Sequence, residues 1–157
     1  MPACGRPHSA RRWLGRDCES GIELCLDPHI ARPPRFADAG FNDLVRPAMY
    51  GAWHEIELLP RSQGDRSILN TAVAGPLCES GDMFTQSPSG DLLLRALPRA
   101  HVGDLMVLHD AGAYGASMSS NYNSRPLIPE VLVEGTSSRL IRRRQTIEEL
   151  LSLEDVG

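Results

Sequence analysis

The chain has 157 residues, of which 41% are hydrophobic and 5% aromatic, and its formal net charge is -4. This length is sufficient for one domain with a largely aliphatic core, and the apolar fraction excludes a wholly disordered chain. The acidic balance argues against a nucleic-acid-binding protein, which usually needs a basic face. No apolar run approaches the roughly 18 residues that a membrane span requires.

Residues 1–37 differ in composition from the rest of the chain, with six arginines, three cysteines and two histidines. Cys18, Cys25 and His29 have the best spacing for zinc, but they lack the close Cys-x-x-Cys pair that structural zinc sites usually contain. We therefore predict no metal site and a poorly ordered leader. The arginines are followed by no continuous apolar stretch, which argues against a signal peptide and favours a cytoplasmic chain with reduced cysteines.

From Asp38 onward the pattern is that of a folded domain, assigned as residues 38–157. Residues 41–50 are predicted to be a loop or short turn broken by Pro47. The expected strands are 52–59, 68–77, 91–97 and 105–109, followed by a hairpin of 130–134 with 139–143. Thr146 and Glu149 have capping-box spacing, which predicts a short terminal helix. Short strands separated by turns indicate a mainly β fold, a Greek-key-like barrel or sandwich.

Three reactive side chains, Cys78, Glu79 and Ser80, follow the strand at 68–77 directly. A cysteine after an apolar strand is more often a small buried hydrophobe. Here Gly75-Pro76 stiffens the approach and Gly81-Asp82 turns the chain away, which favours a thiol that faces a site. A cysteine hydrolase would also need a histidine base, and no local signature selects one from His54, His101 and His109.

A second group of candidate residues comes from two other segments. Arg46 and Tyr50 are four residues apart, and a guanidinium and a phenol with this spacing can converge on one carboxylate. Tyr114 lies between Gly112 and Gly115, which leave room for a ligand beside its ring. Residues 118–125 are densely polar, which is typical of a solvated loop or of a ligand or interface loop. From spacing alone, a surface arginine and a packed tyrosine are the better explanation of Arg46 and Tyr50, and a core aromatic ring is the alternative for Tyr114.

Five segments in this order resemble the diaminopimelate decarboxylase family, whose members are pyridoxal-phosphate (PLP) enzymes related to the ornithine and arginine decarboxylases. The segments are FNDLVRPAMYGAWH, AGPLCESGD, HDAGAYGASMSSNYNSRP, PEVLVEG and LIRRRQTIEELL. The resemblance runs from about residue 38 to residue 154, roughly three quarters of the chain. The resemblance is to the C-terminal β domain of that family and does not extend to its N-terminal α/β barrel.

The resemblance implies a role for each candidate residue. Cys78 is similar to the residue that protonates the substrate α-carbon after CO2 leaves, and Glu79 to the ligand of the distal amino group. Arg46 and Tyr50 resemble the binders of the distal carboxylate. Tyr114 resembles a contact for the substrate and for the cofactor phosphate. The family forms a homodimer, in which the Cys-Glu loop reaches the partner subunit's cofactor.

The chain departs from the family pattern in two respects. All 16 of its basic residues are arginine, so the Schiff-base lysine that holds PLP in the family is absent. Residues 1–37 also do not match what the family places before Asp38, and Pro33 and Pro34 interrupt the expected strand. The composition of this leader fits translation in a wrong reading frame, a hypothesis that the upstream DNA would test.

The sequence thus predicts the C-terminal domain of an enzyme that decarboxylates meso-diaminopimelate to L-lysine and CO2. We expect the isolated chain to be inactive and to expose apolar faces that the family covers with the other domain and the second subunit. The alternative is a non-enzymatic β-barrel module that binds a partner or ligand through the same loops.

Overall fold

The computed structural model describes residues 11–14, 20–25 and 35–155. Its strands are β1 Arg11–Leu14, β2 Ser20–Cys25, β3 Arg35–Phe36, β4 Ile56–Leu59, β5 Ile68–Thr71, β6 Val73–Ala74, β7 Arg95–Pro98, β8 Leu105–Leu108, β9 Glu130–Glu134 and β10 Ser137–Arg142. Its helices are α1 Arg46–Tyr50, α2 Gly112–Gly115, the 3-10 turn η1 Tyr122–Ser124 and α3 Ile147–Leu150. The chain is therefore mainly β, as the sequence predicts.

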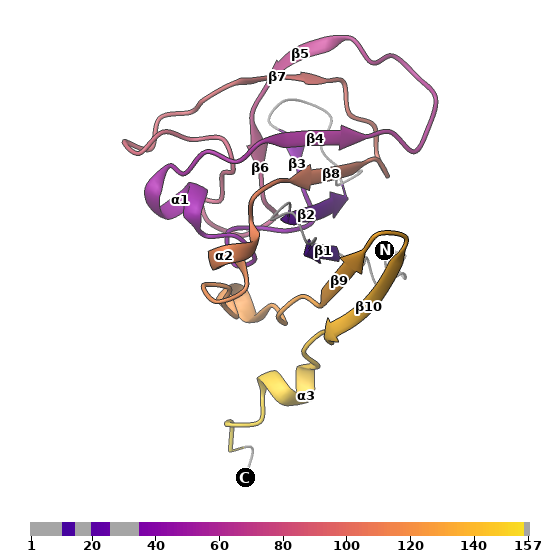
Figure 1. Ribbon diagram of the computed structural model, residues 1–157. Helices are drawn as coiled ribbons and strands as arrows, with labels where there is room; N and C mark the ends of the chain where they lie inside the picture. The colour runs from indigo at the N-terminus through magenta and orange to yellow at the C-terminus, as the bar shows by residue number, and fades with distance from the viewer. Residues whose placement is uncertain (1–10, 15–19, 26–34, 156–157) are drawn as a thin grey trace, which may run out of the picture.

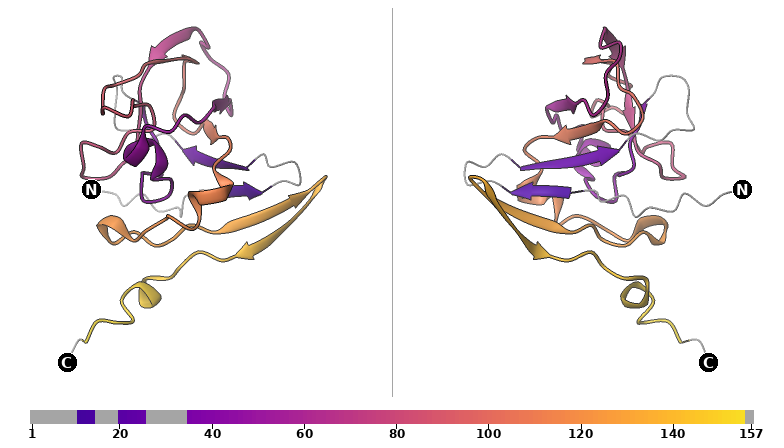
Figure 2. Two further views of the ribbon diagram at one scale, coloured as in Figure 1. Left: turned by 60° about the vertical axis from the view of Figure 1, so that its left-hand side comes forward. Right: turned by 90° about the vertical axis from the view of Figure 1, so that its right-hand side faces the viewer.

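The strands form one large sheet and two short pairs. The six-stranded sheet has the order β10-β9-β1-β2-β8-β4 (Figure 1). Its neighbours are antiparallel except β1 and β9, which are parallel. The pairs are β3 with β6 and β5 with β7. In the β9–β10 hairpin, β9 pairs with β1 and β10 forms the edge of the sheet, and α3 lies beyond the hairpin towards the C-terminus (Figure 2).

The core lies against β8, whose alternating pattern buries every second side chain. Met106 and Leu108 are 2% and 0% exposed, while their neighbours are half-buried. The core cluster consists of small and aliphatic side chains with a single aromatic ring: Ala37, Ala39, Leu44, Ile56, Val73, Phe84, Ala100, Met106, Leu108 and Ala111. The aliphatic core expected from the low aromatic content is thus observed.

The expected capping box at the terminal helix is present. Thr146 Oγ1 accepts a hydrogen bond from the Glu149 amide at 3.2 Å, and the Thr146 amide donates to Glu149 Oε2 at 2.9 Å. These bonds satisfy backbone donors that the first turn of a helix leaves unpaired. The predicted short helix at this end of the domain is confirmed.

Two local predictions are wrong. Residues 46–50 form helix α1, because Pro47 occupies the first turn, where a missing amide hydrogen breaks no helical bond. Residues 91–97 are not a buried strand: β7 begins only at Arg95, and Leu92 and Leu94 are 55% and 56% exposed. Apolar character indicated burial there, but the residues before β7 lie on the surface.

Part of the predicted leader takes part in the sheet. β1 and β2 lie between β9 and β8, so two segments from residues 1–37 fill the middle of the strand order. The zinc candidates Cys18 and His29 lie outside the described residues, as does the side chain of Cys25. The domain boundary at residue 38 remains a prediction.

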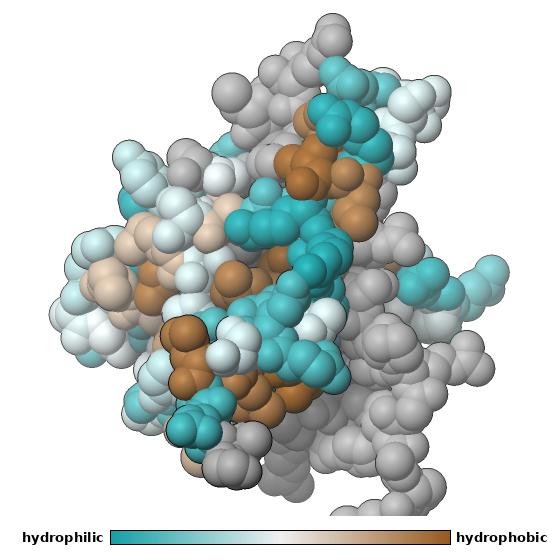
Figure 3. All heavy atoms as spheres, turned by 90° about the horizontal axis from the view of Figure 1, so that it is seen from below, coloured by the Kyte–Doolittle hydropathy of each residue, from teal (hydrophilic) through white to brown (hydrophobic). Residues whose placement is uncertain are grey.

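Several apolar side chains are exposed on the hairpin and the terminal helix. Leu140 is 57%, Ile147 52% and Leu153 96% exposed. On the face seen from below, brown apolar groups lie between teal hydrophilic ones (Figure 3). None of the helices within the described ranges has both the length and the apolar character needed to cross a bilayer.

Candidate functional site

Helix α1 places Arg46 and Tyr50 on one face, because residues four apart in a helix lie one above the other. The helix ends at Gly51, which adopts φ +60° and donates its amide hydrogen to the Pro47 carbonyl at 2.9 Å. A Cβ atom at Gly51 would lie 2.2 Å from the Pro88 nitrogen. A glycine is therefore required here both by the backbone conformation and by the close approach of the neighbouring loop.

The guanidinium of Arg46 lies close to two tyrosine rings from different helices. Its carbon is 5.6 Å from the ring centroid of Tyr50 and 4.9 Å from that of Tyr114, which α2 supplies. Arg46 is half-buried, whereas the tyrosines are 52% and 55% exposed. One positive group and two phenols thus gather at the surface, a donor set that suits a carboxylate or a phosphate.

The Cys78–Glu79 loop connects β6 to the segment after Asp82. Its two ends are joined by a hydrogen bond from the Gly75 amide to the Asp82 carbonyl at 2.8 Å. A second bond of 3.1 Å, from the Asp82 amide to the Glu79 carbonyl, makes the final turn. Cys78 is a free, exposed thiol at the far side of this closed loop. The thiol therefore faces solvent, as the loop interpretation expected, and is not a buried hydrophobe.

Glu79 is held as an exposed carboxylate. Its Oε1 accepts hydrogen bonds from the Gly81 amide and the Ser80 hydroxyl, both at 3.2 Å. These bonds lower the pKa of Glu79 below its ordinary value, the backbone bond most strongly. At neutral pH the loop therefore presents a negative charge next to the thiol, as required to bind an ammonium group.

Tyr122 is a neighbour of this loop that the sequence did not single out. Its hydroxyl lies 3.4 Å from Glu79 Oε2, and its ring contacts Phe41 edge-on with a centroid separation of 4.7 Å. Tyr122 begins η1, within the polar segment 118–125 that the sequence marked as a ligand or interface loop. That polarity was the only available signal, because the pairing of Tyr122 with Glu79 spans 43 residues.

The five predicted site residues thus fall into two groups. Arg46, Tyr50 and Tyr114 form one, and Cys78 and Glu79, joined by Tyr122, form the other. The residues that lead into α1 contact the segment of Tyr122: the Phe41 ring packs against Tyr122, and the Asn42 carbonyl accepts a 2.8 Å hydrogen bond from the Ser120 amide.

Each described histidine is hydrogen-bonded to a group other than the Cys78 thiol. His54 Nδ1 lies 2.9 Å from the His109 carbonyl, and His101 Nε2 lies 2.9 Å from the Asp65 carbonyl. His109 Nε2 lies 3.0 Å from Glu57 Oε2. A nucleophilic cysteine would need a histidine base within hydrogen-bond reach, so these positions argue against a cysteine hydrolase.

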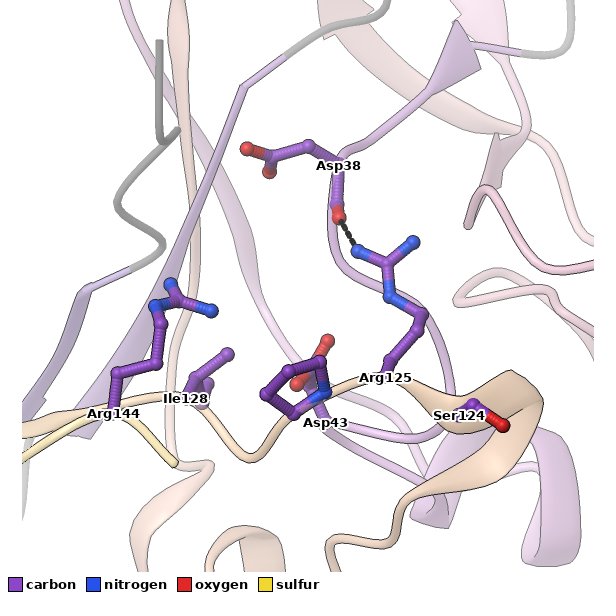
Figure 4. Close-up of a pocket in the computed structure, with 7 residues that line it drawn as sticks. Asp38, Asp43, Ser124, Arg125, Ile128 and Arg144 are labelled. Atoms are coloured by element: carbon purple, nitrogen blue, oxygen red, sulfur yellow. Dashed lines mark hydrogen bonds between the residues drawn. The ribbon is translucent and has the colours of Figure 1, made fainter. Parts of the chain in front are cut away.

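A pocket of about 310 Å³ is lined by charged, polar and apolar side chains: Asp38, Asp43, Ser124, Arg125, Pro126, Ile128 and Arg144. Arg125 reaches across it and donates a 2.6 Å hydrogen bond to the Asp38 carbonyl (Figure 4). None of the predicted site residues lines this pocket. The chemistry expected from the sequence is therefore at exposed loops, as in a site that a second surface completes.

Comparison with known proteins identifies the family. The family model described as "Pyridoxal-dependent decarboxylase, C-terminal sheet domain" matches residues 29–112, more than half of the chain. The chain belongs to this decarboxylase family.

Relatives and solved structures agree with this assignment. The diaminopimelate decarboxylase of Escherichia coli strain K12 is 65% identical over 120 residues, which are 74% of this chain and 29% of that protein. A crystal structure of diaminopimelate decarboxylase is similar with a TM-score of 0.78 and 56% identity, covering 86% of this chain and 34% of that one. The crystal structure of the enzyme from M. jannaschii in co-complex with L-lysine is similar with a TM-score of 0.73 and 34% identity. The match covers 88% of this chain and 30% of that one. The chain thus spans less than a third of the curated relative.

The family match places the decarboxylase sheet domain over β3 to β8, including α1 and the Cys78–Glu79 loop. In the part of this decarboxylase chain that the structure describes, no group of three or more histidine, cysteine or acidic side chains could hold a metal ion.

Proposed function

We propose that this chain supplies the substrate-reading and proton-donating half of a diaminopimelate decarboxylase site. The reaction converts meso-diaminopimelate to L-lysine and CO2. The observation that carries the proposal is the placement of the Arg46 guanidinium close to both the Tyr50 and Tyr114 rings, with an exposed thiol and carboxylate on a separate closed loop. The 65% identity to the E. coli enzyme supports the choice of substrate.

The substrate has two amino-acid ends, of which only one reacts. The unreacting end carries an ammonium and a carboxylate, so its recognition requires groups of both signs. Glu79, whose pKa is lowered, binds the ammonium, and Arg46 with the Tyr50 hydroxyl binds the carboxylate. This division of charge distinguishes the substrate from a simple diamine or a monocarboxylic amino acid.

The cofactor proposed for this site is PLP, which acts as an electron sink for the charge left on the α-carbon when CO2 departs. Tyr114 fits its phosphate group, because an exposed phenol beside a guanidinium offers a donor in a positive environment. The 157 residues contain no lysine, so the amine that binds PLP comes from another polypeptide segment. The isolated chain is therefore inactive.

Cys78 delivers the final proton. Its thiol is exposed on a loop closed at the base by the Gly75–Asp82 hydrogen bond, so it can reach an α-carbon held by another surface. A thiol is an adequate general acid for quenching a delocalised carbanion. The partners in this proposal are a PLP-binding domain and a second copy of the enzyme. The exposed apolar groups at Leu140, Ile147 and Leu153 provide area for such contacts.

The test is a chimera in which residues 38–157 replace the corresponding segment of the E. coli decarboxylase. We expect PLP-dependent CO2 release from meso-diaminopimelate by the chimera and none by the 157-residue chain. A folded, PLP-loaded chimera without turnover would contradict the proposal. So would turnover by the isolated chain. If ligands bind the isolated chain without turnover by the chimera, the non-enzymatic module is the better account.

The proposed binding of the distal carboxylate by Arg46 can be tested separately. Arg46→Ala in the chimera should raise KM for meso-diaminopimelate by about tenfold or more, because a charge-assisted hydrogen bond of roughly 1.5–3 kcal/mol is lost. Arg139→Ala, at an exposed position on β10, is the matched control and should leave KM unchanged. Equal KM values for both variants would exclude Arg46 as a substrate ligand.

A further inference from the structure

One carboxylate, that of Asp82, lies at the base of the Cys78–Glu79 loop. The backbone of Asp82 closes this loop, and its side chain is 2% exposed. The sequence marked Asp82 only as a residue that turns the chain away. The buried position of its side chain shows that it points inward, beneath the loop whose two reactive groups face solvent.

Each oxygen of this carboxylate accepts a backbone hydrogen bond from a different segment. Oδ2 accepts from the Leu77 amide at 2.8 Å, and Oδ1 accepts from the Phe41 amide at 2.7 Å. Leu77 directly precedes Cys78. Phe41 carries the ring that contacts Tyr122, whose hydroxyl lies 3.4 Å from Glu79. A single side chain therefore fixes the backbone before the thiol and the segment whose aromatic ring supports the Glu79 contact.

The surrounding backbone leaves the carboxylate no room to move. A Cβ atom at Gly75 would lie 2.2 Å from Asp82 Oδ2, and one at Gly40 would lie 2.8 Å from the same oxygen. Real side chains do not approach this closely, so both segments pack directly on the carboxylate with bare glycine backbone. The Asp82 carboxylate is therefore held between the backbone at Gly40 and the backbone at Gly75.

Burial raises the pKa of Asp82, and the hydrogen bonds from Leu77 and Phe41 offset part of this effect. A buried carboxylate whose pKa is raised adds less to the stability of the fold than an ion-paired carboxylate would. Its effect is on orientation instead. The carboxylate holds backbone amides from two distant segments on two oxygens whose separation is fixed.

We propose that Asp82 is a positioning residue that fixes the orientation of the Cys78 thiol and, through Phe41 and Tyr122, of the Glu79 carboxylate. The roles of these two groups rest on the proposed function, but their orientation by Asp82 does not.

The test uses the full 157-residue chain with Cys4, Cys18 and Cys25 changed to serine and a nitroxide label on Cys78. Asp82→Asn retains the size of the side chain but can accept only one of the two amide hydrogens while its NH2 group faces the other. We expect the label spectrum to narrow. The amide that faces the new NH2 group, that of Leu77 or that of Phe41, should exchange with solvent about tenfold faster, as loss of one hydrogen bond implies.

Asp104→Asn is the matched control, because Asp104 is a buried carboxylate that also accepts two backbone amides, those of Arg61 and His101. This change should speed exchange at Arg61 and His101 and leave the Cys78 label unchanged. If both variants shift the label equally, or if Asp82→Asn leaves it unchanged, Asp82 has only a structural role and the proposal is wrong.

If Asp82→Asn does not fold, amide hydrogen exchange in the unmodified chain still tests the proposal. Because they share one acceptor group, the amides of Phe41 and Leu77 should be equally protected from exchange, and much better protected than the exposed Ser80 amide. Free exchange at Leu77 in the folded chain would overturn the proposal. None of these readouts requires turnover, so a failed decarboxylase test does not affect them.

Discussion

Asp82 and Asp104 are both buried carboxylates that gather backbone amides from two segments, yet their environments differ. Asp82 accepts from Phe41 and Leu77 and lies under the Cys78–Glu79 loop. Asp104 is 0% exposed and accepts from the Arg61 amide at 2.9 Å and the His101 amide at 2.7 Å. Only Asp104 also accepts hydrogen bonds from a guanidinium, that of Arg66.

The guanidinium reverses the direction of the pKa shift. At both sites burial is the largest cause and raises the pKa. At Asp104 the bonds from Arg66, Arg61 and His101 overcome burial and lower the pKa to about 2, whereas at Asp82 burial prevails. Asp104 thus stabilises the fold by joining two loops with compensated charge. Asp82 is less compensated, which is consistent with a role in orienting a loop.

The largest expected effect is from Asp104→Asn, which should lower the free energy of unfolding by about 3 kcal/mol. The variant leaves the Arg66 guanidinium without its anionic partner, and an amide group faces one of the two backbone donors. Urea unfolding followed by circular dichroism measures the loss. A change below about 1 kcal/mol, as is typical of exposed ion pairs, would remove the distinction between the two carboxylates.

The pH dependence of stability should differ in sign at the two sites. The folded-state pKa of Asp104, about 2, lies below its ordinary value of 3.8, so its contribution is present above that value and is lost as the pH falls towards 2. The expected loss is about 2 kcal/mol. Asp82, whose pKa is raised, opposes this loss, because protonation favours the folded state.

Urea unfolding of the chain between pH 5 and pH 2, compared with Asp104→Asn, isolates the Asp104 contribution. The variant should lack this part of the decline. Parallel curves for the two proteins would show that Asp104 does not titrate differently in the folded and unfolded states.

Gly75→Ala should destabilise the chain by about 2 kcal/mol, within the range for inserting a methyl group into a packed site. The new Cβ would lie 2.2 Å from Asp82 Oδ2, where it must displace the carboxylate. Gly81→Ala in the same loop is the control, since its Cβ would meet only Glu79 Oε1 at 3.8 Å, an ordinary contact. Thermal melting of both variants checks this, and equal midpoints would mean that the Asp82 site is loosely packed.

The smallest expected effect on stability is that of Asp82→Asn, about 1 kcal/mol. The amide loses one hydrogen bond but removes the cost of burying a charge. Its urea midpoint should therefore fall less than that of Asp104→Asn. A larger fall at Asp82 would make Asp82 the main structural carboxylate and weaken its assignment as a positioning residue.

Local patterns predicted the parts of the fold that depend on neighbouring residues. The capping box of Thr146 and Glu149 is confirmed because it needs only three-residue spacing. β8 at Leu105–Leu108 is confirmed because a short apolar run next to a turn is a local signal for a strand. Helix α1 was missed because Pro47 was taken as a breaker, although proline is tolerated in a first turn.

Long-range contacts could not be predicted in this way. The bond from the Phe41 amide to Asp82 spans 41 residues, and neither residue type signals it. Tyr122 was missed for the same reason. Arg46 and Tyr50 could be paired from their spacing, but the addition of Tyr114 to them requires the tertiary fold. The functional roles of Cys78 and Glu79 stay predictions that rest on family resemblance.

The most direct test of the account is the turnover of Cys78→Ala in the chimera with the E. coli decarboxylase. Loss of the general acid should lower kcat for CO2 release from meso-diaminopimelate by about 100-fold or more, with little change in KM. Ser89→Ala, an exposed hydroxyl on another loop, should leave kcat unchanged. A kcat of Cys78→Ala equal to that of the Ser89→Ala control would contradict the claim that this chain supplies the proton donor.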